Sequence, residues 1–131
     1  MVKQKKNLEE TANELEPIAV EKATCEDHVR PMLEEIKKSD GVIGYILRNT
    51  TSATIDINDP TKVIDYAILS SSTFEASEQL TEMFDLGKLR NITVEGKDAK
   101  TVHLNIDENS ISIFMEKTVD TKKILEEMDA L

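Results

Sequence analysis

The sequence predicts an α+β fold, with a five-stranded antiparallel sheet covered by helices on both faces. Three observations lead to it: a long helical pattern over 62–86, two strand patterns before it, and three strand patterns in quick succession after it. Shorter helical patterns open and close the domain, which gives the order α-β-β-α-β-β-β-α. Helices with apolar faces must bury them on a sheet, and a layered architecture follows.

Composition excludes several functional classes. The chain has 131 residues and a net charge of −10, with 39% hydrophobic and 32% charged residues, as expected of one globular domain. Such an acidic surface disfavours nucleic acid and anionic membranes, whereas a basic protein surface would complement it. No stretch approaches the roughly 18 apolar residues of a membrane span, and no signal peptide is predicted. With Cys25 as the single cysteine, we expect a cytoplasmic protein.

Residues 1–23 are predicted to form an N-terminal arm outside the domain. Leu8, Ala12 and Leu15 would share one face of a short helix that Pro17 ends, but a flexible tail fits the composition equally well. The domain itself is expected over 24–131.

The first half of the domain is predicted to form a helix and two strands. Pro31 is expected in the first turn of the helix, the position that tolerates proline. Residues 42–47 are apolar on both alternating faces, which predicts a central strand covered on both sides. Residues 53–57 alternate, so we expect a strand whose wet face carries Thr54 and Asp56.

The long helix is the element around which the others are arranged. Thr61 is placed to cap its first turn, and Gly87 follows its last apolar residue, where the chain needs a left-handed exit. Its small and apolar residues form two stripes, each on one face of the helix. The first stripe is Leu69, Thr73, Ala76, Leu80 and Met83; the second is Ile64, Ala67, Ser71 and Phe74.

Two stripes predict two packing partners, because a helix that packs on a single sheet needs only one apolar stripe. We expect one stripe on the sheet and the stripe with Ile64 on a second copy of the chain. The small residues 70–73 would let another backbone come close. Two alternatives remain open: a fully enclosed core helix, or a strand at 66–69 followed by a serine loop.

Three strands and a helix complete the domain. The strands are predicted at 91–95, 101–106 and 111–115, separated by short polar turns. His103 is expected at the surface of the sheet. A final helix over 120–128, capped by Asp120 or Thr121, turns apolar residues inward.

The local sequence motifs and the order of the predicted elements resemble those of the roadblock/dynein light chain family. The resemblance rests on Gly41-Val42-Ile43-Gly44 opening the first strand, the small-residue helix, Gly87-Lys88-Leu89 before the third strand, and the final helix. It covers about 25–131, and the longin and profilin folds share much of the architecture. The resemblance implies a homodimer or a heterodimer with a related chain, as in archaeal or bacterial regulators of Ras-like small GTPases. The dimer would pair third strands and pack long helices together.

The resemblance and the second stripe together predict the interaction residues. Arg90–Glu95 should pair with its symmetry mate, since an exposed edge bearing Ile92 and Val94 otherwise invites aggregation. The predicted dimer interface is Ile64, Ala67, Ser71, Phe74, Arg90, Ile92 and Val94. The acidic outer surface of the long helix is the expected partner surface, with Glu75, Glu78 and Glu82.

No catalytic, cofactor or metal site is predicted. The phosphate-binding glycine loop is missing, and Cys25 with His28 offers too few ligands for zinc. Arg48 and Arg90 are each either an arginine finger for a GTPase or, more simply, a strand-end arginine paired with a carboxylate. We therefore expect a non-enzymatic module that regulates or scaffolds a Ras-like GTPase. Alternatives are a small-ligand sensor and an adaptor subunit of a motor or trafficking complex.

Overall fold

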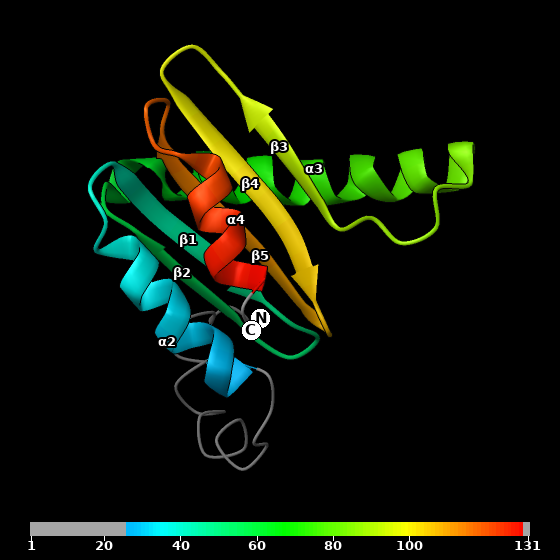
Figure 1. Ribbon diagram of the computed structural model, residues 1–131, viewed down its shortest axis with the longest axis horizontal. Helices are drawn as coiled ribbons and strands as arrows, with labels where there is room; N and C mark the ends of the chain where they lie inside the picture. The colour runs from blue at the N-terminus through cyan, green and yellow to red at the C-terminus, as the bar shows by residue number, and fades with distance from the viewer. Residues whose placement is uncertain (1–25, 130–131) are drawn as a thin grey trace, which may run out of the picture.

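A computed structural model describes residues 26–129; the predicted arm lies outside the described residues. Figure 1 shows one sheet with α2 and α4 on the near face and α3 across the far face. The elements are α2 (Glu26–Lys37), β1 (Val42–Arg48), β2 (Ala53–Ile57), α3 (Val63–Phe84), β3 (Asn91–Glu95), β4 (Ala99–Ile106), β5 (Asn109–Glu116) and α4 (Thr121–Asp129). The predicted fold class and element order are confirmed.

The five strands are antiparallel and lie in the order β2-β1-β5-β4-β3. The two strands that flank α3 in sequence, β2 and β3, therefore lie at opposite edges of the sheet. A connection between them must cross the whole sheet, and α3 makes this crossing (Figure 1). The topology explains why the longest helix stands between the second and third strands.

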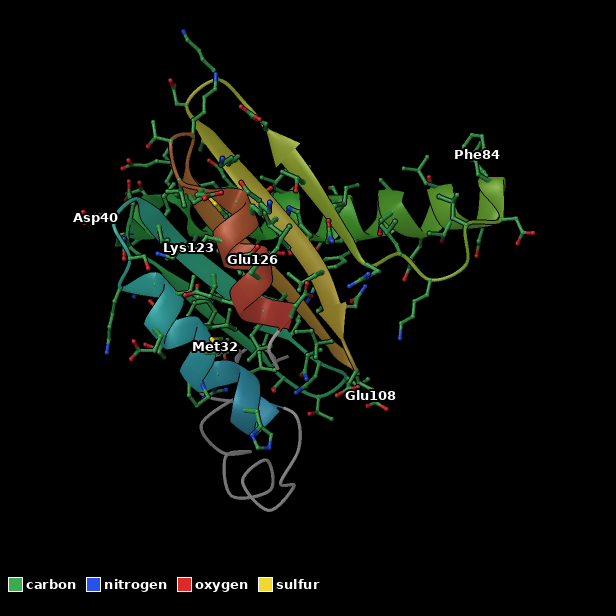
Figure 2. The ribbon with its side chains drawn as sticks, in the orientation of Figure 1. Met32, Asp40, Phe84, Glu108, Lys123 and Glu126 are labelled. Carbon is green, nitrogen blue, oxygen red and sulfur yellow. The ribbon has the colours of Figure 1, made fainter. Side chains whose placement is uncertain are left out.

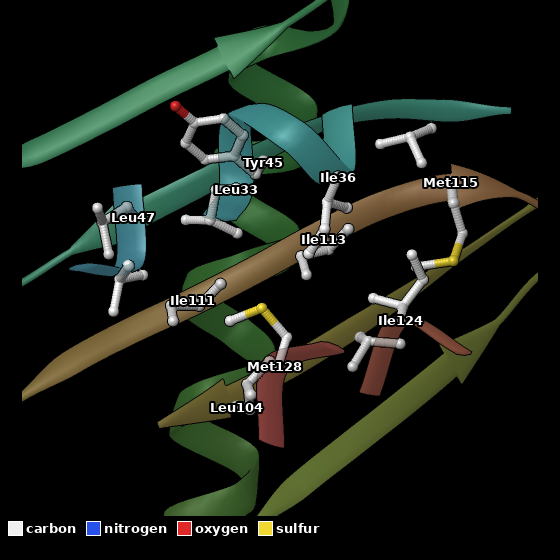
Figure 3. Close-up of a cluster of buried hydrophobic side chains, with 13 residues drawn as sticks. Leu33, Ile36, Tyr45, Leu47, Leu104, Ile111, Ile113, Met115, Ile124 and Met128 are labelled. Atoms are coloured by element: carbon white, nitrogen blue, oxygen red, sulfur yellow. The ribbon is translucent and has the colours of Figure 1, made fainter. Parts of the chain in front are cut away.

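The near face holds the main hydrophobic core, shown in Figure 3. It joins α2 and α4 to the alternating side chains of β1, β4 and β5, which are apolar because both layers exclude water from them. The buried core residues are Val29, Leu33, Ile36, Val42, Tyr45, Leu47, Val102, Leu104, Ile111, Ile113, Met115, Ile124 and Met128. This cluster fixes α2 and α4 on one side and leaves the other side to α3 alone.

The start of α2 differs from the prediction. The helix begins at Glu26, so Pro31 lies in its interior instead of its first turn. Val29 explains the difference, because it is fully buried and extends the inward face of Leu33 and Ile36 by one turn. Pro31 itself is exposed, so its ring does not disturb the packed face.

The faces of β2 are also opposite to the prediction. Arg30 Nη2 of α2 donates to Thr54 Oγ1 at 2.9 Å, and Lys37 forms an ion pair with Asp56, so the expected wet face lies beneath a helix. Ile55, expected inward, has 43% of its surface exposed. Alternation located the strand correctly, but α2 covers its polar face with charged side chains.

The ends of α3 depend on Asp59 and Asp85. The Asp59 carboxylate accepts from the Thr61 N–H at 3.0 Å and begins a 3₁₀ turn, so Thr61 is not the cap that we expected. At the other end Asp85 adopts the left-handed conformation, with φ of 54°. Gly87 is left-handed as well, with φ of 77°, but it follows two residues after that cap.

The sheet-facing line of α3 shares one residue, Thr73, with the two predicted stripes. Ser70, Thr73 and Ser77 are the buried residues of this helix. Ile64 and Met83, one from each predicted stripe, expose 71% and 72% of their surfaces. A fully enclosed helix and a strand at 66–69 are thereby excluded. The helix packs through small hydroxyl side chains, and much of its apolar surface faces outward.

A buried polar layer joins α3 to the sheet. The Nδ1 atom of His103 lies 2.7 Å from Ser112 Oγ, and its Nε2 atom lies 2.7 Å from Thr101 Oγ1. Ser112 Oγ in turn lies 2.6 Å from Ser70 Oγ on α3. His103 is 1% exposed, which corrects the expectation of a surface position. We call these four residues the polar layer.

Aromatic rings enclose the polar layer. Phe74 and Phe114 meet the His103 ring edge to face, at centroid distances of 5.6 and 6.2 Å. Tyr66 stacks on Phe114 at 4.5 Å. Burial lowers the pKa of His103 from 6.5 to about 4, so the imidazole is neutral at pH 7. One ring nitrogen then donates and the other accepts, and its two hydroxyl partners satisfy both.

This pKa predicts how stability depends on pH. Above pH 6.5 neither folded nor unfolded His103 binds a proton, so its contribution is complete. Between pH 6.5 and about 4 the unfolded chain takes up a proton that the folded chain excludes, and the free energy of unfolding falls. At about 1.4 kcal/mol per pH unit, the loss reaches about 3 kcal/mol.

Urea unfolding of the wild type and of His103→Gln, at several pH values between 4 and 7, measures this term. The amide retains a donor and an acceptor but does not titrate, and the carboxylates are common to both proteins. We expect a steeper fall for the wild type. If the free energy of unfolding fell equally with pH in both proteins, protonation of His103 would not destabilise the fold.

Candidate interaction surface

The far end of α3 extends beyond the sheet. The helix has 22 residues and is about 33 Å long at 1.5 Å per residue. Five strands at about 4.8 Å spacing need only about 19 Å from β2 to β3. Figure 1 shows the surplus projecting past β3, and Figure 2 places Phe84 at its tip, away from the sheet.

This projecting end, which we define as residues 80–86, carries an exposed apolar surface. The exposed fractions are 42% for Leu80, 72% for Met83, 63% for Phe84 and 58% for Leu86. Large apolar side chains gathered in one exposed patch are typical of a protein–protein contact. The four residues were not in the predicted interface. The length of the helical pattern, compared with the width of a five-stranded sheet, is the signal that could have found them.

The edge of β3 lies beside this projecting end. The Gly96 N–H donates to the Ala99 carbonyl at 2.8 Å. With the Cα register, this bond determines which residues of β3 are hydrogen-bonded to β4 and which are not. Every second residue of β3 therefore turns its N–H and C=O groups away from β4. These residues are Asn91, Thr93 and Glu95. The strand contains neither proline nor lysine, two residues that commonly protect an edge.

The side chains of β3 continue the apolar surface. Ile92 lies opposite His103 and Val94 lies opposite Thr101, so both share the face that α3 covers. Val94 is 38% exposed, and Ile92 is half-buried. The β3 edge carries backbone groups that no strand of residues 26–129 pairs with, and together with the projecting end it places apolar side chains on the same side of the sheet.

The predicted interface residues on α3 differ in exposure. Ile64 and Ser71 are exposed, whereas Ala67 and Phe74 are half-buried and turn partly toward the sheet. Ile64 lies in the half of α3 that starts beside β2, because the helix crosses from β2 to β3. The structure does not bring it next to the β3 edge within one chain.

The two arginines have different surroundings. Arg48 Nη1 donates to Ser71 Oγ at 3.1 Å, and the guanidinium carbon lies 5.7 Å from the Phe74 ring centroid. Arg48 therefore packs against α3 instead of pairing with a carboxylate as the simpler interpretation had it. Arg90 lies 3.9 Å from Asp129, and both side chains are exposed, so this ion pair contributes little.

The predicted acidic partner surface lies on the outer side of α3. Glu75, Glu78 and Glu82 are exposed and spaced three and four residues apart, so they share one face. Within residues 26–129 no ion pair joins them to a basic side chain. Their field is therefore not neutralised by a bound lysine or arginine of the described part of the chain.

In the part of the chain that the structure describes, no three His, Cys, Asp or Glu side chains cluster as metal ligands would. No described helix is long and apolar enough to cross a membrane. His28 is exposed on α2, and Cys25 lies outside the described residues.

Comparison with known proteins identifies the fold. No protein-family model matches the sequence, and the search of curated proteins gave no match. Among solved structures, a Roadblock/LC7 domain from Streptomyces avermitilis is similar, with a TM-score of 0.63 and 14% identity. The match covers 76% of this chain and 87% of that one. The chain therefore has the roadblock/LC7 fold.

Proposed function

We propose that the chain is a non-enzymatic adaptor or regulatory module that forms a dimer through β3 and α3 and binds a Ras-like small GTPase. The observation that carries the proposal is the projecting end of α3, which lies beside an unprotected β3 edge. Neither feature is explained by the packing of a single chain. The fold and the acidic surface of α3 support the choice of partner.

A two-fold axis at the β3 edge gives both features a partner. If two β3 strands pair antiparallel about Thr93, the outward groups of Asn91 and Glu95 meet those of the second copy, and the sheet continues without a break. The projecting end of each α3 then lies over the sheet of the other copy. Helix length and edge chemistry lead to the same arrangement.

The energy of such an interface comes mainly from the apolar side chains. Fully burying a side chain such as leucine, methionine or phenylalanine contributes about 1.5–3 kcal/mol. Met83, Phe84 and Leu86 are each more than half exposed in one chain, and the two-fold axis would bury each of them twice. The main-chain hydrogen bonds between the two β3 strands would fix their register and make the association specific.

The first prediction tests edge pairing. Thr93→Pro deletes an N–H that points away from β4, so the monomer should fold while the dimer dissociates. Sedimentation or light scattering at micromolar concentration measures the change. Thr93→Ala keeps the N–H and should remain dimeric. A folded Thr93→Pro variant that stays dimeric would place the interface elsewhere.

The second prediction tests the projecting end. Met83→Lys puts a charge where a neighbouring sheet is expected, and because Met83 is 72% exposed in one chain, the stability of the monomer should not change. We expect dimer affinity to fall at least about tenfold, equivalent to 1.4 kcal/mol. Thr118→Lys, an exposed site in the turn before α4, is the control. Equal dimer affinity in the two variants would contradict the proposal.

The third prediction concerns the GTPase. Reversing Glu75, Glu78 and Glu82 to lysine should slow association and reduce its salt dependence, because exposed charges act mainly on the encounter rate. The control reverses Asp40, Glu108 and Glu126, which are exposed, lie outside α3 in the sequence and change net charge equally.

The measurement is stopped-flow association with a small GTPase captured from lysate of the source cells, at two salt concentrations. Both triple variants should remain dimeric. Equal association rates for the two variants would show that the GTPase docks away from the outer face of α3.

A further inference from the structure

The second edge of the sheet is β2, which lies across the whole sheet from β3. The Asn58 N–H donates to the Ile43 carbonyl at 3.0 Å, so these two residues form a hydrogen-bonded pair. In the same register every second residue of β2 turns its N–H and C=O groups away from β1. These residues are Ala53, Ile55 and Ile57. No strand of residues 26–129 pairs with this side of β2.

The side chains along this edge meet an exposed apolar flank of α3. Ile55 lies on the face that α3 crosses, yet it is 43% exposed. Ile64 and Ile68 expose 71% and 60% of their surfaces, and with Ser71 they share one line of the helix. Arg48 of β1 donates to Ser71, so this line faces the strip of sheet beside β2. We call Ile55, Ile64 and Ile68 the β2 surface.

The Arg48 guanidinium lies at one end of the β2 surface. Its contacts are the Ser71 hydroxyl and the Phe74 ring, and it forms no ion pair with any residue of 26–129. A guanidinium has five N–H donors, so others remain for a carboxylate. Ala53 lies opposite Arg48 and carries only a methyl group. An acidic side chain on a strand beyond Ala53 can therefore reach Arg48 across it.

We propose that β2 receives an added strand from a partner protein, antiparallel to β2. Aliphatic side chains lie opposite Ile57 and Ile55, and a carboxylate lies opposite Ala53 and pairs with Arg48. Because side chains alternate along a strand, the segment has the order aliphatic-x-aliphatic-x-acid from its N-terminus. Main-chain bonds to the outward groups of β2 hold the segment, and the alternate side chains make it specific.

A second copy of β2 complements this edge less well. If two β2 strands paired antiparallel about Ile55, Ile57 of one copy would lie opposite Ala53 of the other. Arg48 would then meet an aliphatic side chain instead of a carboxylate. The charge of Arg48 therefore favours a partner of different sequence. Because β2 and β3 are opposite edges, the inference depends neither on the proposed dimer nor on the GTPase.

Synthetic peptides test the pairing with Arg48 in the full chain. The probe is fluorescein-labelled Thr-Val-Thr-Ile-Thr-Glu-Thr, and two control peptides carry glutamine or lysine in place of glutamate. Fluorescence anisotropy should show that the wild type binds the probe about threefold more tightly than the glutamine peptide, as expected of a partly exposed ion pair. Arg48→Glu should instead prefer the lysine peptide. Absence of probe binding, equal binding of probe and glutamine peptide, or an unchanged preference in Arg48→Glu would overturn the proposal.

Substitutions of Ile55 test the strand pairing itself. Ile55→Ala and Ile55→Pro both remove the side chain, but only proline removes the outward N–H. Circular dichroism checks that both variants fold, and Ile55→Pro should bind the probe at least about tenfold more weakly than Ile55→Ala.

Amide hydrogen exchange locates the bound peptide. Saturating probe should slow the exchange of the Ala53, Ile55 and Ile57 amides of the wild type at least about tenfold. Protection of the β3 amides instead would place the peptide at the other edge. Equal probe binding by the two Ile55 variants would contradict strand addition. Slow exchange at β2 that rises on dilution without peptide would show that a second copy occupies this edge, which would also overturn the proposal.

Discussion

The rest of the structure depends on the polar layer between α3 and the sheet. His103, Ser112 and Ser70 are buried, and each buried polar atom must keep a partner, because leaving one unpaired costs about 1–3 kcal/mol. The bond from Ser70 to Ser112 therefore fixes the rotation of α3 about its own axis. With the hydroxyl line turned inward, Ile64 on one flank of α3 and Met83 on the other face outward. The exposed surface of the helix is a consequence of its polar contact with the sheet.

The strand pattern was predictable for a physical reason. In β1, β4 and β5 both packed layers exclude water, so apolar residues recur at the positions that face α2 and α4. The rotation of α3 was not predictable from the same rule. A helix that packs through Ser70 and Ser77 places hydroxyls where apolar periodicity expects leucine. His103 was wrongly predicted to be exposed for the same reason. A polar residue in an alternating strand is predicted to face water unless its hydrogen-bond partners are known.

The candidate surface was predictable only in part. Ile92 and Val94 follow from the resemblance and from the hazard of an exposed edge, and both lie at that edge. Whether they contact a second copy stays a prediction. The projecting end was missed because Leu80 and Met83 were assigned by helical phase alone. Helical phase gives the direction of a side chain around the axis, whereas exposure also depends on whether the sheet still lies beneath that turn of the helix.

The two edges of the sheet differ in what surrounds them, and this difference argues for different partners. At β3 the side chains that face α3 are apolar, and the projecting end leaves room for a second sheet beneath it, so a copy of the same surface is complementary. At β2 the helix above carries Arg30 and Lys37, which contact Thr54 and Asp56 of the strand. The two edges of one sheet are therefore not equivalent surfaces for association.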